Sequence, residues 1–147
     1  MSWKLIACFS RGPDLPRLGI GRADSGEWLV DTGMGKLVAI DQYRGIQAAL
    51  PLLESDYPTV ISHIKKGLSD LGLDDRLVDT FPISALIAEG LSFPTARWPS
   101  DALRWAEQIE NPDSHIISAL RRLRSSGTQQ QRHTAQRILY KSTGTGE

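Results

Sequence analysis

The chain has 147 residues, of which 40% are hydrophobic and 23% are charged, and its 17 Lys and Arg residues balance 17 Asp and Glu residues. These values fit an ordinary globular protein that needs no disulfide or metal for stability, and they exclude a long disordered chain or a collagen-like polymer. A net charge of zero removes the simplest electrostatic argument for nucleic acid or an anionic membrane, so we expect neither as a partner.

The single cysteine, Cys8, cannot form an intramolecular disulfide, and this favours a reducing compartment. Nowhere do 18 apolar residues run together, so the sequence predicts no membrane-spanning helix and no signal peptide. We therefore expect a cytoplasmic protein, monomeric, without a cofactor or a bound metal.

The first 40 residues are typical of β structure. Runs of strand-forming residues alternate with turn residues such as Asp24-Ser25-Gly26. The sequence predicts an antiparallel meander of three or four strands with one face packed on helices. The runs are 5–9, 17–22, 27–31 and 36–40.

After Ile40 the apolar residues recur at helical spacing. We expect one α+β domain over residues 1–141, in which the meander (1–40) is followed by a mainly helical part (41–141), with a flexible tail at 142–147. The last third is a three-helix segment. The expected helices are 42–53, ended early by Pro51; 57–71, stopped by Gly72; 83–89, closed by Gly90; 100–109, capped by Ser100; 114–125; and one that begins after Thr128 with the spacing of a capping box.

Charge is distributed unevenly along the chain. Residues 1–40 hold five basic and four acidic residues, 41–111 hold six and eleven, and 112–147 hold six and two, so the segments carry +1, −5 and +4. Four aspartates of the middle segment lie in and around one turn between helices: Asp70, Asp74, Asp75 and Asp79. They form either a solvated loop or a surface that binds a basic site on another protein.

The basic residues of the last segment fall mostly off the apolar stripes of their helices. They could form a phosphate-binding face, or they could complement helix dipoles and pair with the acidic middle of the chain. Only Tyr140 lies near them, and this scarcity of aromatic residues argues against stacking on single-stranded bases. The residues are Arg121, Arg122, Arg124, Arg132, Arg137 and Lys141.

The string Leu29-Val30-Asp31-Thr32-Gly33 matches the apolar-apolar-Asp-Thr-Gly loop of aspartic proteases. Such chemistry needs two aspartates that share a proton, so one loop could work only in a homodimer. The alternative is a hairpin turn in which Asp31 makes a local hydrogen bond. The three histidines, His63, His115 and His133, fall on three different predicted helices, without the spacing of a helical zinc site.

The layout of a short meander followed by helices resembles small bacterial immunity proteins, including those of contact-dependent growth inhibition systems. The residues that carry this resemblance are Ala102-Leu103-Arg104-Trp105, 119–123 (Ala-Leu-Arg-Arg-Leu) and 131–137 (Gln-Arg-His-Thr-Ala-Gln-Arg). It implies a non-enzymatic inhibitor that binds one cognate toxin domain, often a nuclease. Separately, Lys4–Ala7, Pro16–Ile20 and Trp28–Asp31 resemble the small leading domain of fumarylacetoacetate-hydrolase-type proteins, whose catalytic carboxylate ligands do not appear here.

The leading hypothesis from sequence is therefore an immunity protein with no catalytic residues, which neutralises a toxin by 1:1 contact. We expect the contact to involve Asp70, Asp74, Asp75 and Asp79, together with Trp98, which lies between Arg97 and Pro99 in an expected loop. The alternatives are a dimeric hydrolase that uses the Asp31 loop and a nucleic-acid adaptor that uses the C-terminal arginines.

Overall fold

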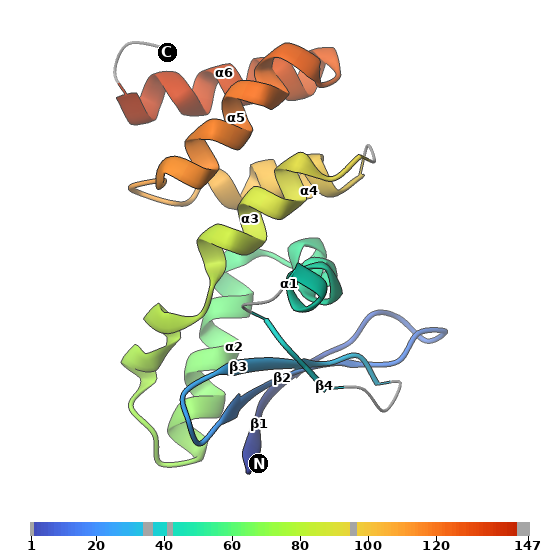
Figure 1. The fold of residues 1–147 in the computed structure, drawn as a ribbon, viewed down its shortest axis with the longest axis vertical. Helices are drawn as coiled ribbons and strands as arrows, with labels where there is room; N and C mark the ends of the chain where they lie inside the picture. The colour runs from blue at the N-terminus through green and yellow to red at the C-terminus, as the bar shows by residue number, and fades with distance from the viewer. Residues whose placement is uncertain (1, 34–36, 41–42, 95–96, 144–147) are drawn as a thin grey trace. The chain divides into compact units, whose positions relative to one another are not determined.

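A computed structural model describes residues 2–33, 37–40, 43–94 and 97–143. The chain divides after Pro82 into two compact units, each described by itself below. A four-stranded antiparallel sheet at the N-terminus is followed by helices, which confirms the α+β class (Figure 1).

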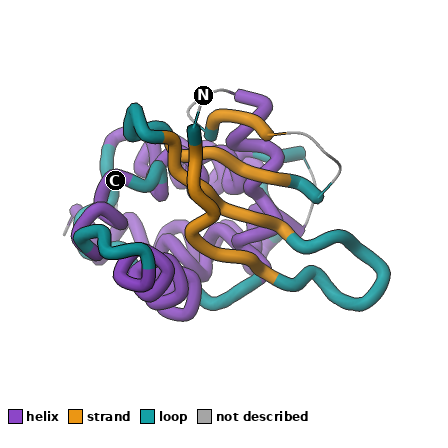
Figure 2. Tube along the Cα trace, turned by 90° about the horizontal axis from the view of Figure 1, so that it is seen from below, coloured by secondary structure: helices purple, strands orange, loops and turns teal. Residues whose placement is uncertain are grey.

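The sheet of the N-terminal unit is a simple meander. Its strands are β1 (Trp3–Phe9), β2 (Leu18–Ala23), β3 (Trp28–Asp31) and β4 (Leu37–Ala39), paired in the order β1-β2-β3-β4. Figure 2 shows the four strands side by side in orange. The predicted meander is confirmed, and each strand agrees with its predicted run to within two residues.

Alternation of large and small residues in β2 gives its two faces different partners. A Cβ added to Gly21 would overlap the ring of Trp3, and one added to Gly19 would crowd Leu5, so the two glycines leave room for side chains of β1. Ile20 pairs directly with Val30 of β3, and both side chains are fully buried. β2 is thus covered on both faces.

The helical elements of this unit are α1 (Tyr43–Ala49), the 3-10 helix η1 (Leu50–Glu54), α2 (Tyr57–Asp70) and the 3-10 helix η2 (Asp75–Thr80). Pro51 ends α1 early, as predicted, because its ring excludes the α-helical hydrogen bond, and the chain continues as η1. Gly72 stops α2 with φ +75°, where its N–H donates to the Ser69 carbonyl oxygen and the Leu73 N–H donates to that of Leu68.

Helix α2 packs very closely on β1. A β-bulge lies between Leu5 and Ala7, and a Cβ added at Gly67 of α2 would overlap the carbonyl oxygen of Ile6. The rings of Phe9 and His63 lie 5.0 Å apart on the same pair of elements. The bulge and the glycine together let the helix backbone approach the strand.

Trp28 connects the sheet to the end of η2. Its indole Nε1–H donates to Thr80 Oγ1 over 2.9 Å, and its ring meets Phe81 edge-on at 5.2 Å between centroids. Because Trp28 and Phe81 are both buried, this contact joins β3 to the residue after η2 within the core of the N-terminal unit.

The C-terminal unit consists of two helical hairpins. The first is α3 (Ile83–Ser92) with α4 (Arg97–Ala106), and the second is α5 (Ser114–Ser126) with α6 (Gln129–Thr143). α3 packs on α5 and α4 packs on α6, so the second hairpin stacks on the first. Each helix turns an apolar stripe inward, and α6 buries Ala135, Ile138 and Leu139 as predicted.

Three predicted helix ends in this unit are wrong. α4 ends at Ala106 rather than Ile109, because the N–H groups of Gln108 and Ile109 donate three residues back, to Trp105 and Ala106, as in a turn. α3 continues through Gly90 to Ser92, because burial of Leu91 outweighs the roughly 1 kcal/mol helix cost of glycine. α4 begins at Arg97 rather than after Ser100, since Pro99 is tolerated in a first helical turn, where its missing N–H has no helical partner anyway. Ser100 therefore lies inside α4, and Trp98 lies on a helix rather than in the expected loop.

Helix α6 runs through Thr143, two residues past the predicted boundary at Lys141, and residues 144–147 of the expected tail lie outside the described residues. Within the described residues, no helix has the length and apolar character that crossing a bilayer requires.

The close approach at Gly67 can be tested by whether Gly67→Ala raises or lowers the free energy of unfolding. In an ordinary helix, Gly→Ala raises the free energy of unfolding by about 0.5–1 kcal/mol. Here we expect Gly67→Ala to lower it by about 1–3 kcal/mol, because the added methyl group overlaps the Ile6 carbonyl. Urea unfolding followed through the Trp28 indole NMR signal measures the change, with the exposed Ser69→Ala as control. A stabilised Gly67→Ala protein would contradict the close packing.

Candidate functional site

The Asp31 carboxylate bonds to its own loop. Asp31 Oδ1 accepts the backbone N–H of Gly33 over 2.9 Å, and Gly33 has φ +80°, a conformation that favours glycine. The interpretation as a turn with a local side-chain hydrogen bond is confirmed. Residues 34–36, which follow, lie outside the described residues, and the dimeric hydrolase stays a prediction.

Potential metal ligands and nucleophiles are dispersed. His63, His115 and His133 are exposed on α2, α5 and α6, three separate helices as predicted, and Cys8 is half-buried on β1. Among the described residues, no three His, Cys, Asp or Glu side chains come together in a way that could hold a metal ion.

The four predicted aspartates follow the end of α2 and η2, and we call them the acidic surface: Asp70, Asp74, Asp75 and Asp79. All four are exposed. Asp70 pairs with Lys66 one helical turn earlier, with 3.0 Å between Oδ2 and Nζ. Asp74 accepts the Arg76 backbone N–H, which caps η2, and also binds the Arg76 guanidinium at 2.8 Å. Two of the four carboxylates thus have basic partners within the surface.

Arg76 interacts with three of the four aspartates of the acidic surface. Its side-chain and backbone hydrogen bonds hold the pKa of Asp74 below the usual range. In turn the bond to Asp74, and then the charges of Asp75 and Asp79, raise the pKa of Arg76. Asp79 also acts on Tyr57, whose pKa is raised first by burial and then by this carboxylate. One guanidinium therefore offsets part of the charge that three aspartates bring together.

Trp98 lies in the first turn of α4 and is half-buried. The Arg97 guanidinium carbon lies 5.4 Å from the centroid of its ring, and Arg97 also reaches Asp101 at 3.8 Å. The indole is thus partly covered by a neighbouring cation. Trp98 belongs to the C-terminal unit and the acidic surface to the N-terminal unit, so each is a candidate contact by itself.

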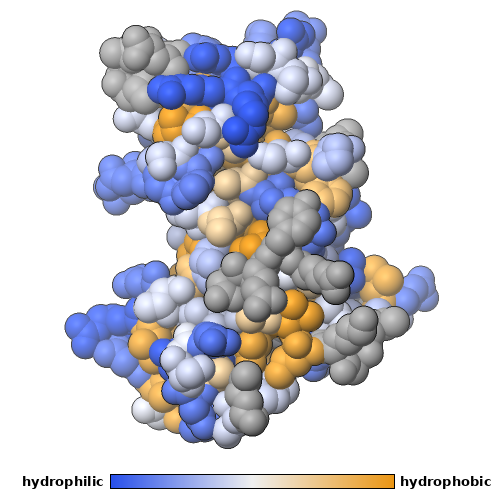
Figure 3. All heavy atoms as spheres, in the orientation of Figure 1, coloured by the Kyte–Doolittle hydropathy of each residue, from blue (hydrophilic) through white to orange (hydrophobic). Residues whose placement is uncertain are grey.

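The charged side chains in the second hairpin of the C-terminal unit are all basic. Residues 114–143, which span α5, α6 and their turn, contain six Lys and Arg residues and no Asp or Glu. Three of the six bond to neighbours: Arg122 to Ser92 Oγ, Arg124 to Gln136 Oε1 and Arg137 to Glu107 Oε1. Hydrophilic side chains gather over these helices in Figure 3.

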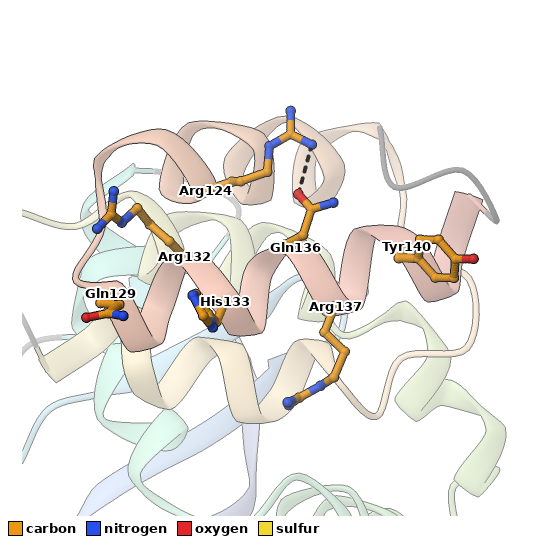
Figure 4. A pocket seen from close by; sticks show the side chains of 7 residues that line it. All are labelled: Arg124, Gln129, Arg132, His133, Gln136, Arg137 and Tyr140. Carbon is orange, nitrogen blue, oxygen red and sulfur yellow. Dashed lines mark hydrogen bonds between the residues drawn. The ribbon is translucent and has the colours of Figure 1, made fainter.

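One exposed face of α6 carries polar and basic side chains at helical spacing. We call this face the α6 stripe. With Arg124 of α5 it borders an open hollow of about 700 Å³ (Figure 4). Figure 4 shows the hydrogen bond between Arg124 and Gln136 as a dashed line. Arg132 and Arg137 leave α6 on opposite sides, and Tyr140 lies at its far end. The stripe consists of Gln129, Arg132, His133, Gln136, Arg137 and Tyr140, all of them exposed.

The predicted capping box fixes the beginning of α6. Thr128 Oγ1 accepts the Gln131 N–H over 3.2 Å, and Gln131 Oε1 accepts the Thr128 N–H over 3.1 Å. Gln131 also donates through Nε2 to Ser100 Oγ of α4 at 3.0 Å. Gln131 is only 6% exposed, so this bond between helices sets the rotation of α6 and turns the stripe outward.

An exposed face of a helix has to be polar, because its side chains are in contact with water. That requirement explains why the α6 stripe is polar, but not why its charges have one sign. Lys and Arg mixed with Asp and Glu would serve solubility equally well. Residues 114–143 contain no Asp or Glu, and one of their arginines, Arg137, pairs with Glu107, which follows α4.

Sequence reasoning identified the arginines of this face and placed Tyr140 near them, but it did not identify the glutamines that share the face. Gln129, His133, Gln136 and Tyr140 follow one another at i, i+4, i+7 and i+11, a spacing that a helical projection of 129–143 would have revealed.

Comparison with models of protein families, with curated protein sequences and with solved structures gives no match.

The Asp74–Arg76 pair gives a prediction for solution measurement. Because the pair lowers the pKa of Asp74, its stabilising effect is present above the ordinary carboxyl pKa and is lost as the pH falls through the lowered value. We expect NMR titration of the Asp74 side chain to show a midpoint below the ordinary range for aspartate, and Arg76→Gln to raise that midpoint. An Asp74 midpoint that does not change in Arg76→Gln would show that the pair does not persist in solution.

Proposed function

We propose that this protein binds nucleic acid through the cations of α5 and α6. The observation that carries the proposal is the segregation of charge: six Lys and Arg residues and no Asp or Glu within residues 114–143. Phosphate backbones are the most widespread linear polyanions, and Lys and Arg neutralise them with release of counterions. The hollow along the α6 stripe adds hydrogen-bonding side chains to this charge.

A net charge of zero over the whole chain does not oppose nucleic-acid binding, because the charges of the two units differ in sign. The charge of the N-terminal unit, with 9 basic and 11 acidic residues in 1–82, is −2, and that of residues 83–147, with 8 and 6, is +2. Within the latter, five of the six acidic residues precede α5 and the sixth is Glu147. A ligand close to α6 is within about one Debye length, or 8–10 Å, of the cations that it contacts, and more distant charges are screened.

The salt dependence of binding tests the proposal. Fluorescence anisotropy of labelled 20-nucleotide DNA and RNA, single-stranded and duplex, should show affinity that falls steeply between 50 and 200 mM salt, by roughly a thousandfold if about six phosphates are contacted. Arg121→Ala and Arg132→Ala should each reduce the slope of log K against log salt by about one.

The matched controls are Arg17→Ala and Lys65→Ala, which remove exposed cations of the N-terminal unit and should leave the slope unchanged. Binding that is insensitive to salt, or an effect of the controls equal to that of the α5 and α6 variants, would overturn the proposal.

Toxin neutralisation of the immunity type is the second candidate, and the acidic surface favours it. Four exposed carboxylates against Lys66 and Arg76 leave an excess of negative charge, which would accelerate encounter with a basic active site. We rank it second because part of this charge is already neutralised within the surface.

Charge reversal tests this second candidate. If the acidic surface binds a toxin, changing Asp70, Asp74, Asp75 and Asp79 to Lys should abolish the protection of cells from the toxin encoded next to this gene. Reversal of three exposed carboxylates elsewhere in the same unit, Asp14, Asp24 and Glu27, serves as the control and should leave protection intact. Full protection by the quadruple variant would remove the acidic surface from consideration.

A further inference from the structure

We infer that α6 is a recognition helix that enters the major groove of duplex DNA, with the central side chains of its stripe toward the bases and its arginines toward the phosphates. The inference rests on the proposed function and deepens it, because it specifies the form of nucleic acid and the role of each part of the stripe.

The order of side chains around α6 carries the inference. At about 3.6 residues per turn, Gln129, His133, Gln136 and Tyr140 follow a single line along the helix. Arg132 falls on one side of that line and Arg137 on the other, as Figure 4 shows. The centre of the stripe therefore consists of hydrogen-bonding side chains, and an arginine lies on each edge, of which Arg137 also bonds to Glu107.

This order matches the cross-section of a DNA groove. The major groove of B-DNA, about 12 Å wide, admits an α-helix, with base edges at its floor and a phosphate backbone on either side. An edge arginine can then meet each backbone while the central line faces the bases. A helix that served only as an electrostatic anchor would need no glutamine side chains between its arginines.

Helix α5 supplies further phosphate contacts from beside the groove. It is joined to α6 by the two residues Gly127 and Thr128, so its last turn stays close to the beginning of α6. Arg124, in that last turn, bonds to Gln136 at 3.3 Å and thereby helps to hold the amide of a central residue. Arg121 is exposed one turn earlier. A preceding helix against the backbone and a following helix in the groove is an established docking geometry.

The central side chains have the chemistry that base edges require. Gln donates and accepts through one amide and can pair with N6 and N7 of adenine in the major groove. Gln129 and Gln136 are seven residues apart, about 10 Å along the helix at 1.5 Å per residue. This separation corresponds to about three base-pair steps of 3.4 Å. We therefore expect a short preferred sequence that contains adenine.

Other anionic partners fit the stripe less well. Single strands are bound through several stacking aromatics, and Tyr140 is the only Phe, Tyr or Trp of the stripe. The major groove of double-stranded RNA is too deep and narrow for side chains to read. A helix that lies on an anionic membrane needs an exposed apolar face, whereas the large apolar side chains Ile138 and Leu139 of α6 are buried.

The test selects preferred sequences from a randomised duplex DNA library with the full chain. We expect a motif of about four to five base pairs that contains adenine. We also expect tighter binding of that duplex, by tenfold or more, than of its RNA duplex, its single strands or phosphatidylserine vesicles. Gln129→Ala and Gln136→Ala should each relax the preference at one position without changing the salt slope.

Gln130→Ala is the matched control, since Gln130 is an exposed glutamine of the same helix off the stripe, and it should keep the motif. The inference is overturned if double-stranded RNA, single strands or vesicles bind as tightly as the selected duplex, or if both stripe variants retain the full motif. Failure of the proposed function has a different signature, because no nucleic acid of any form would then show salt-dependent binding.

Discussion

The Gln131 side chain is the contact on which the candidate site of this protein depends. It is the only polar or charged side chain that is buried among the described residues, and it bonds both to Thr128, at the beginning of α6, and to Ser100 on α4. A buried amide is costly when its partners are lost, so α6 has one favoured rotation about its axis. That rotation buries Ala135, Ile138 and Leu139 and turns the arginines and glutamines of the stripe outward.

The N-terminal unit depends on backbone approach instead. Gly67 lets the backbone of α2 approach the bulged β1, and Gly21 lets the ring of Trp3 lie against β2. Part of the packing in this unit is therefore made against the backbone rather than between large side chains. The unit presents its carboxylates on α2 and η2, where Lys66 and Arg76 balance part of their charge. Each unit thus has its own core and its own dominant surface charge.

Charge separated along the sequence reconciles a neutral chain with an electrostatic function. Single-sign charge over two helices attracts a polyanion locally, and the opposite charge of the other segments maintains neutrality without entering the contact. The two proposals use different surfaces, α5 with α6 and α2 with η2, so variants of one leave the other intact and the functions can be tested separately.

The sequence by itself determined the meander, the helices with clear apolar stripes, the stop at Gly72 and the capping box at Thr128, because these depend on local periodicity and local hydrogen bonds. It also indicated the turn at Asp31 and the position of the arginines. It failed at Gly90 and Ser100, where packing of Leu91 and the position of Pro99 override local signals. Only the tertiary structure decided which face of α6 is exposed, that Arg124 of α5 joins Gln136 there, and that Gln131 bonds to Ser100 of α4. Those relations depend on helix rotation and on contacts between elements, which burial of the core sets after the local structure has formed.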